Sequence, residues 1–225
     1  MNDIHSTVII EGDVKIGKNN RILPYTIIYG PIEIGDDNII GPHVVIGTPG
    51  QDTRNPRYDS SDCFIKIGNR NIIREFTAIQ KPCYENVTFI GDDVFLMQGV
   101  HIPHDAHIYN NVVITPMCVL AGITKILDGS NIGIGATINQ RCVLGHYSFV
   151  AANAAVTKNI KPFSRYIPNK PISVNEYAIH KYGFEKKYED IHNFVIKNII
   201  PKDKELLRII DEFYFLHEKS NLSMY

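Results

Sequence analysis

Residues 90–150 read IGDDVFLMQGVHIPHDAHIYNNVVITPMCVLAGITKILDGSNIGIGATINQRCVLGHYSFV and carry an aliphatic residue at every sixth position. The series begins at Ile90 and continues to Val156. Six is a multiple of the two-residue period of a strand, so every member faces the same side of a β surface. A helix, with its period of 3.6 residues, would spread the same residues around its circumference. The stretch therefore predicts short strands that share one buried face.

The same spacing extends over two earlier blocks, from Ile4 to Ile46 and from Ile67 to Ile79. The three blocks together hold 23 aliphatic positions. This is the hexapeptide repeat of a parallel β-helix, in which three hexads make one triangular coil and the helix is left-handed. Twenty-three hexads correspond to between seven and eight coils. We therefore predict an all-β solenoid, a left-handed parallel β-helix, over residues 1–160.

The six-residue period breaks at residues 48–64 and 80–89, which are rich in polar residues and proline. Insertions in a solenoid leave as loops on one face, often the binding face, so both loops are candidate parts of a site. Residues 161–225 are predicted to form an extended linker and a small C-terminal helical domain. Helices are expected in three segments, 172–184, 186–199 and 202–218, and the last of these has apolar residues at helical spacing.

Composition excludes several classes of protein. The 225 residues have a formal net charge of −1, which disfavours a nucleic-acid-binding protein with its usual basic excess. No apolar run approaches the roughly 18 residues of a membrane-spanning helix, and the N-terminus lacks a signal-peptide pattern. We therefore expect a cytoplasmic protein with no transmembrane segment. The four cysteines show no CxxC spacing, which argues against a zinc knuckle or a redox pair and for small core residues.

One cluster of chemistry-bearing residues lies between His101 and His107, which enclose His104 and Asp105. Three His and one Asp can form a metal site, but alternation along the strand makes their directions diverge, so we predict no metal. They can also be solvated turn residues. A His beside a carboxylate can act as a general base, because imidazole titrates near neutral pH and the carboxylate fixes its tautomer.

A second cluster lies in the first loop, where Gln51, Asp52 and Arg54 offer an amide, a carboxylate and a cation. This set suits a polar, phosphorylated ligand. The alternative interpretation is a solvated loop.

Four blocks of the sequence resemble a known family: IGNRNIIREFTAI at 67–79, the run at 90–114, LAG at 120–122, and YIPNKPISVNEYAIHKYGF at 166–184. They are similar to the acyl-carrier-protein-dependent UDP-N-acetylglucosamine O-acyltransferases of lipid A synthesis. They are equally similar to the nucleotide-amino-sugar N-acyltransferases. Both groups are left-handed β-helix acyltransferases. The resemblance implies a homotrimer with each active site between neighbouring prisms.

The resemblance also implies roles for single residues. His104 falls on the family's catalytic His, and Asp105 follows it to orient the imidazole. Gly122 keeps the L-A-G context and is the expected source of an oxyanion-binding N–H. The residues expected to bind substrate are Gln51, Asp52 and His101, Arg54 where the family has a Lys, Asn139 and Gln140 in the acyl pocket, Asn175 near the nucleotide, and Lys181 from a basic pair whose other member is Tyr182 here.

The chain departs from the O-acyltransferases at three positions. Ile123 and Asn139 stand where that family has His. Ala151 aligns with a Gly that leaves room for a long acyl chain, and a methyl group there would shorten the acyl tunnel. We therefore expect a short acyl group rather than a long hydroxyacyl chain.

The resemblance and these departures together imply the following function. The enzyme moves a short acyl group from acyl-CoA to the amino group of a UDP- or dTDP-linked amino sugar, for bacterial cell-surface glycan synthesis. His104 is the general base, and no cofactor is permanently bound. The alternative is O-acylation of UDP-N-acetylglucosamine from acyl carrier protein. A third hypothesis, of a different class, is a catalytically silent β-helix that serves as a scaffold or binds bicarbonate like a carbonic anhydrase.

Overall fold

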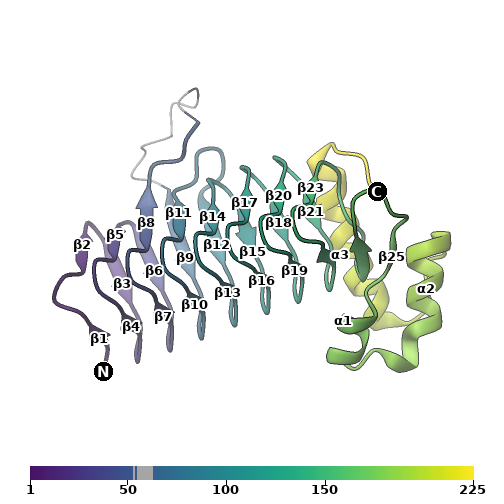
Figure 1. Ribbon diagram of the computed structural model, residues 1–225, viewed down its shortest axis with the longest axis horizontal. Coiled ribbons are helices and arrows are strands. Elements are labelled where there is room, and N and C mark those ends of the chain that lie inside the picture. Colours follow the sequence, from purple (N-terminus) through teal and green to yellow (C-terminus); the bar gives the residue numbers. More distant parts are fainter. Residues whose placement is uncertain (53, 55–62) are drawn as a thin grey trace.

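The computed structural model describes residues 1–52, 54 and 63–225, and its strands wind into a triangular prism (Figure 1). The parts of the expected loop 48–64 at position 53 and at 55–62 lie outside the described residues. Consecutive strands β1 to β23 pass around three faces in rotation, which gives the predicted seven to eight coils. The predicted parallel β-helix is therefore confirmed.

The strands of the described residues fall into three sheets, one for each face of the prism. Face A contains β1 (Asp3–Ile4), β4 (Arg21–Ile22), β7 (Ile39–Ile40), β10 (Ile72–Ile73), β13 (Phe95–Leu96), β16 (Val113–Ile114), β19 (Asn131–Ile132), β22 (Phe149–Val150), β24 (Ser164–Tyr166) and β25 (Ser173–Val174). Face B contains β2 (Ile9–Glu11), β5 (Ile27–Tyr29), β8 (Val45–Thr48), β11 (Ala78–Gln80), β14 (His101–Ile102), β17 (Val119–Leu120), β20 (Thr137–Ile138) and β23 (Ala155–Val156). Face C contains β3 (Val14–Ile16), β6 (Ile32–Ile34), β9 (Phe64–Ile67), β12 (Val87–Ile90), β15 (His107–Ile108), β18 (Lys125–Ile126) and β21 (Val143–Leu144).

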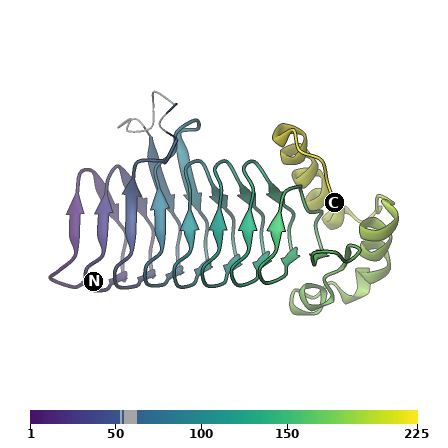
Figure 2. The ribbon, with the colours of Figure 1, turned by 45° about the horizontal axis from the view of Figure 1, so that its top comes forward.

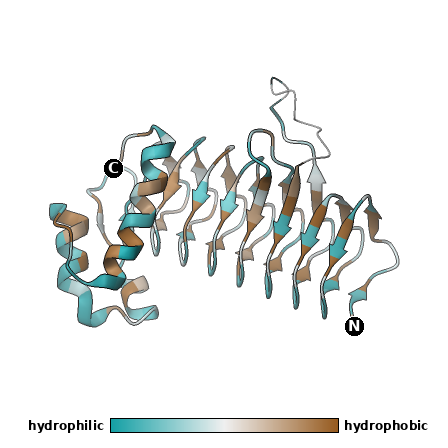
Figure 3. Cartoon of the chain, turned by 180° about the vertical axis from the view of Figure 1, so that it is seen from behind, coloured by the Kyte–Doolittle hydropathy of each residue, from teal (hydrophilic) through white to brown (hydrophobic). Residues whose placement is uncertain are grey.

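The six-residue series forms the core because its members stack on one another in parallel register. Ile79 pairs with Ile46 below it and with Ile102 above it. Every member from Ile22 to Val156 is buried, and none is more than 4% exposed. Hydrophobic segments recur in each coil along the prism (Figure 3). All four cysteines are also fully buried, as expected for small core residues.

The first coil is an exception to the expected burial of the series. Ile4 and Ile10 are each 40% exposed. In the parallel ladders, β1 and β2 each have a neighbour on one side only, β4 and β5 respectively. The end of a solenoid therefore leaves its terminal apolar residues partly in solvent.

The C-terminal segment folds over the other end of the prism (Figure 2). It contains α1 (Glu176–Lys181), a 3-10 turn (Glu185–Lys187), α2 (Tyr188–Lys197) and α3 (Lys204–Ser220). The first helix is shorter than the expected 172–184, because Ser173–Val174 pairs antiparallel with β24 and Asn175 then caps the helix. Asp203 caps α3 by accepting hydrogen bonds from the backbone N–H groups of Glu205 and Leu206. None of the described helices is long and apolar enough to cross a membrane.

Helix α3 packs on face C, where Phe213 contacts a small cluster with Leu127 and Val143. Lys161, in the segment after the last coil, is buried and donates hydrogen bonds to the carbonyl oxygens of Phe194 and Val195 at the end of α2. These contacts fix the helices against the prism, since a cation satisfies the carbonyl groups that a helix leaves free at its C-terminus.

Candidate active site

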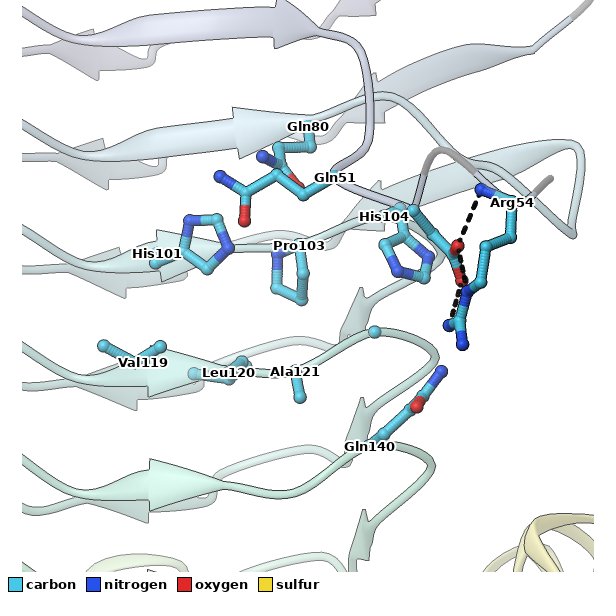
Figure 4. Close-up of a pocket in the computed structure, with 12 residues that line it drawn as sticks. Gln51, Arg54, Gln80, His101, Pro103, His104, Val119, Leu120, Ala121 and Gln140 are labelled. Atoms are coloured by element: carbon cyan, nitrogen blue, oxygen red, sulfur yellow. Dashed lines mark hydrogen bonds and ion pairs between the residues drawn. The ribbon is translucent and has the colours of Figure 1, made fainter. Parts of the chain in front are cut away.

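A cavity of about 730 Å³ runs along the corner where face B turns into face C, crossing several coils (Figure 4). We call this edge the B/C corner. Its lining consists of Gln51, Asp52, Arg54, Gln80, His101, Pro103, His104, Val119, Leu120, Ala121, Gly122 and Gln140. The cavity thus brings together residues of the first loop with both His residues of the H-I-P-H-D stretch. His104, Gly122 and Gln140 follow one another at intervals of 18 residues, which is the step from His101 to Val119 between neighbouring coils.

His104 and Asp105 form a buried dyad. The Nδ1 atom of His104 lies 2.7 Å from Oδ2 of Asp105. Asp105 is fully buried, and His104 is 7% exposed. A carboxylate at Nδ1 favours the tautomer that carries its proton there, which leaves Nε2 with a lone pair. Nε2 is therefore the atom that can accept a proton from a nucleophile.

The second loop holds the carboxylate of Asp105 in place. The backbone N–H groups of Cys83, Tyr84 and Glu85 all donate hydrogen bonds to it, the shortest at 2.7 Å from Glu85. A carboxylate that accepts several N–H groups is fixed in orientation. The dyad consequently depends on chain that lies about twenty residues before it in the sequence.

The position of this loop follows from an insertion. The step from Ala78 to its partner His101 is 23 residues, compared with 18 from His101 to Val119. The loop is shorter than the expected 80–89, because Gln80 still belongs to β11 and β12 already begins at Val87. Val87 extends the ladder of face C by pairing with Phe64.

Gly122 lies against the imidazole ring from the coil above. A Cβ atom at this position would be 2.2 Å from Cε1 of His104 and 2.4 Å from its Nε2. Only glycine therefore fits without moving the ring. Among the hydrogen bonds of the described residues, none is donated by the N–H of Gly122, and the same holds at Gln140 one coil further on. The regular corner thus offers a free N–H beside His104, as an oxyanion site needs.

Asp52 forms the polar end of the cavity. Its carboxylate accepts hydrogen bonds from Nε and Nη2 of Arg54, both at 2.9 Å, and from the hydroxyl of Tyr84 at 2.6 Å. The hydrogen bonds from Arg54 and then Tyr84 hold the pKa of Asp52 well below its usual range. Asp52 is therefore a fixed anion, while the exposed Arg54 side chain keeps further N–H groups for a ligand.

The three His residues of the cluster do not converge. His101 lines the cavity. Burial, and after it the nearby His104, lower the pKa of His101, which favours the neutral imidazole. His107 turns to face C, where its Nε2 lies 2.9 Å from Oε2 of Glu85. Within the described ranges, no group of three or more His, Cys, Asp or Glu side chains is arranged to hold a metal ion. Burial also raises the pKa of the Cys83 thiol to about 11, so it is not a thiolate nucleophile.

Three expected substrate-binding residues lie outside this cavity. Asn139 is exposed and is not part of the lining. Asn175 accepts a hydrogen bond from the N–H of Ala178 as the cap of α1, donates to the carbonyl oxygen of Tyr147, and lines a separate cavity of about 760 Å³. Lys181 is exposed on α1, with its ammonium group over the ring of Tyr182.

Sequence reasoning missed two residues of the site. Tyr84 joins Asp52 to the dyad, because its hydroxyl bonds Asp52 while its backbone N–H bonds Asp105. Gln80 lines the cavity and is 4% exposed. Both lie where the six-residue period breaks, and that break was the only available signal.

On the far side of the same corner, Glu85 is held by Lys125 and His107. Burial would raise the pKa of Glu85, but hydrogen bonds from His107 and Lys125 outweigh it and lower the value to about 2. Lys125 also donates a hydrogen bond to the carbonyl oxygen of Asp105. This network therefore contacts the backbone of the dyad through the hydrogen bond from Lys125 to Asp105.

Comparisons with known sequences point to acyltransferases. The bacterial transferase hexapeptide family (six repeats) matches residues 13–48. The acyl-(acyl-carrier-protein)-UDP-N-acetylglucosamine O-acyltransferase of Aliivibrio fischeri is 34% identical over 202 residues, covering 81% of this chain and 77% of the relative. The enzyme of the same name from Burkholderia orbicola is 33% identical over 139 residues, covering 60% of this chain and 53% of the relative.

Solved structures show the same architecture. The UDP-N-acetylglucosamine acyltransferase of Francisella novicida superposes with a TM-score of 0.83 at 23% identity, covering 99% of this chain and 91% of the other. The Campylobacter jejuni protein of the same name has a TM-score of 0.79 at 22% identity, covering 99% and 100%. The fold is thus a left-handed parallel β-helix with a small helical C-terminal part, as predicted.

Proposed function

The chain belongs to the family of acyl-(acyl-carrier-protein)-UDP-N-acetylglucosamine O-acyltransferases and is an acyltransferase, and we propose that it transfers an acyl group from acyl carrier protein to a hydroxyl of UDP-N-acetylglucosamine. The names of the relatives favour this donor and acceptor over the expected acyl-CoA and amino group. Acyl carrier protein and a sugar hydroxyl therefore replace the expected acyl-CoA donor and amino acceptor, as in the alternative, a step of lipid A synthesis.

The observation that carries the proposal is the packing of Gly122 against the buried dyad. Nε2 of His104 takes the proton of the sugar hydroxyl while the hydroxyl oxygen attacks the carbonyl carbon of the thioester. Asp105 stabilises the imidazolium that forms. The N–H of Gly122 donates to the oxyanion of the tetrahedral intermediate. When the carbon–sulfur bond breaks, the imidazolium returns the proton to the sulfur, so the products are the ester and the free thiol.

The acceptor occupies the end of the cavity that holds Gln51, Asp52 and Arg54. Asp52 accepts hydrogen bonds from sugar hydroxyls, and the free N–H groups of Arg54 bind phosphate oxygens. His101 lines the wall beyond Pro103 from the dyad, and Gln140 lines the same cavity on the acyl side.

We also propose that a homotrimer completes the site. Asn175 and Lys181 lie outside the cavity of their own chain, which is what a site between two copies requires. They would then approach the nucleotide from the neighbouring copy, with Asn139 on the acyl side. Light scattering on the purified protein tests the assembly: three copies are expected, and a monomer that is fully active contradicts it.

The test of the reaction is turnover with UDP-N-acetylglucosamine and acyl carrier protein loaded with acyl chains of several lengths. Substitution His104→Ala is expected to abolish transfer while the oligomer and the melting temperature are retained, because the base alone is lost. His5→Ala, at an exposed residue of the first coil, is the matched control and should leave turnover unchanged. Near-wild-type activity of the His104→Ala variant would contradict the mechanism.

A second candidate is N-acylation from a short acyl-CoA, and the departures at Ile123, Asn139 and Ala151 favour it. Its mechanism uses the same dyad, with an amine as the nucleophile. The two candidates differ in substrates. Transfer from acetyl-CoA to a UDP- or dTDP-amino sugar, with none from acyl carrier protein, would establish the second candidate and exclude the first.

A further inference from the structure

Gln80 is a buried polar side chain of the cavity that the proposed mechanism leaves unused. It is 4% exposed, and its Oε1 is buried with no hydrogen-bond partner in the part of the chain that the structure describes. Buried amide oxygens in native proteins are nearly always paired with protein, water or ligand. The orphaned amide therefore indicates a group that binds beside it.

The backbone places Gln80 in the cavity by an irregularity of the sheet. Along β11, Ile79 pairs with Ile46, but Gln80 pairs with Thr48, so the ladder skips Gly47. Gly47 has a φ of +95°, a backbone conformation that favours glycine. Such bulges re-aim side chains and occur next to active sites. Ile79 points into the core, so Gln80 points outward, and the bulge sets its position at the cavity wall.

The charged and acid–base groups of the cavity already have partners. Asp52 is bonded to Arg54 and Tyr84, and Nδ1 of His104 is bonded to Asp105. Gln80 and the exposed Gln51 both line this cavity, and Figure 4 draws both side chains on the same wall.

The surface next to the two amides is less polar. His101 and Pro103 lie between them and Val119 on the next coil (Figure 4). The pocket at Gln80 therefore combines a carboxamide with an apolar surface, and it suits a ligand group with both characters.

We propose that Gln80 is a specificity-determining residue that recognises the acetamido group of the acceptor sugar. This inference rests on the proposed nucleotide-sugar acceptor. A carboxamide complements an acetamido group, because each offers an N–H donor and a C=O acceptor. The amide can turn about its terminal torsion to meet either atom. The acetyl methyl group then rests on the surface formed by Pro103 and Val119.

Discrimination follows from the burial of Gln80. A sugar with a hydroxyl in place of the acetamido group lacks its carbonyl oxygen, its N–H and its methyl group, so it leaves the side chain of Gln80 without the partner that the acetamido group supplies. A site built to hydrogen-bond a substrate group rejects the analogue that lacks it, because the buried polar groups of the site stay unpaired. Gln80 thus disfavours sugars without an acetamido group.

The experiment compares kcat/KM for UDP-N-acetylglucosamine and UDP-glucose in the wild type and in Gln80→Met, which keeps length and removes hydrogen bonding. The variant is expected to lose about 10-fold with UDP-N-acetylglucosamine and less than about twofold with UDP-glucose. The control is Gln98→Met, an exposed residue on a different corner, which should change neither value. An equal loss with both sugars, as a purely structural role predicts, or no loss with either, overturns the inference.

Calorimetric binding of the two nucleotides separates this inference from the proposed function. A wild type that binds UDP-N-acetylglucosamine more tightly than UDP-glucose but transfers no acyl group to it contradicts the proposed function. In that case, loss of the binding preference in Gln80→Met supports the inference, and retention of the preference overturns it. A wild type that shows no preference between the two nucleotides, or binds neither, also overturns it.

Discussion

Two corners of the prism share one backbone geometry and differ in chemistry. At the B/C corner the residues with left-handed φ include Asp105, Ile123 and Arg141. At the corner where face A turns into face B, which we call the A/B corner, the corresponding residues include Phe76 and Met117, and both are more than half exposed. The repeat therefore supplies the same turn at both edges, but among the described residues the buried His104–Asp105 dyad lies at the B/C corner alone.

The difference comes from the insertion before the coil that carries His104 and Asp105. At the B/C corner the second loop brings three backbone N–H groups to Asp105. At the A/B corner the rings of Tyr25, His43 and Phe76 stack on one another at centroid distances of 5.1 and 5.4 Å. A regular solenoid yields stacked, repeating side chains. The polar site arises where an added segment supplies hydrogen bonds that the repeat lacks.

The largest expected effect comes from removing the carboxylate of Asp105 at the B/C corner. Asp105→Asn should lower kcat by about 10³-fold, since an amide cannot hold His104 in the required tautomer and meets the three N–H groups with only one acceptor. The control is Asp93→Asn, at the same turn position of the third corner, whose side chain bonds Arg70. Steady-state kinetics with melting curves measure both. A loss below tenfold in Asp105→Asn would show that the dyad is not needed.

A smaller effect on kcat is expected when a glycine is replaced by alanine, and the effect should differ between the two corners. Gly122→Ala should lower kcat by about 10²-fold, because its Cβ displaces the imidazole of His104. Gly99→Ala, at the A/B corner, meets the flexible Sδ of Met117 and has a φ of +67°. It should cost about 1 kcal/mol of stability and leave kcat unchanged. Equal kinetic losses in the two variants would remove the distinction between the corners.

The smallest effect concerns the network behind the dyad. The pKa of Glu85 in the folded protein, about 2, is below its ordinary value of 4.5. A depressed carboxyl pKa contributes stability above the unfolded-state pKa, and this contribution is lost as pH falls through the folded pKa. The urea midpoint of the wild type should therefore exceed that of Glu85→Gln at pH 6, and the gap should shrink between pH 4.5 and 2. A gap that does not change with pH would exclude ionised Glu85 as its source.

Particular residues show how far sequence reasoning reached. The period identified the buried face from Ile22 to Val156, and the adjacency of His104 and Asp105 in the chain suggested their pairing. Asn175 was expected near a nucleotide, but in its own chain it caps a helix. Capping and substrate binding both use a polar side chain, and the sequence does not separate them.

The sequence by itself determined which strand residues face into the prism and which face out, because strand alternation is local and its period is two. Only the tertiary structure decided what meets across coils. Gly122 reaches His104 from 18 residues later, and the N–H groups for Asp105 arrive from about twenty residues earlier. That Oε1 of Gln80 is buried with no partner among the described residues is likewise visible only once the coils are stacked on one another. The physical reason is that an insertion changes the alignment of neighbouring coils, and contacts between coils depend on that alignment rather than on the local pattern.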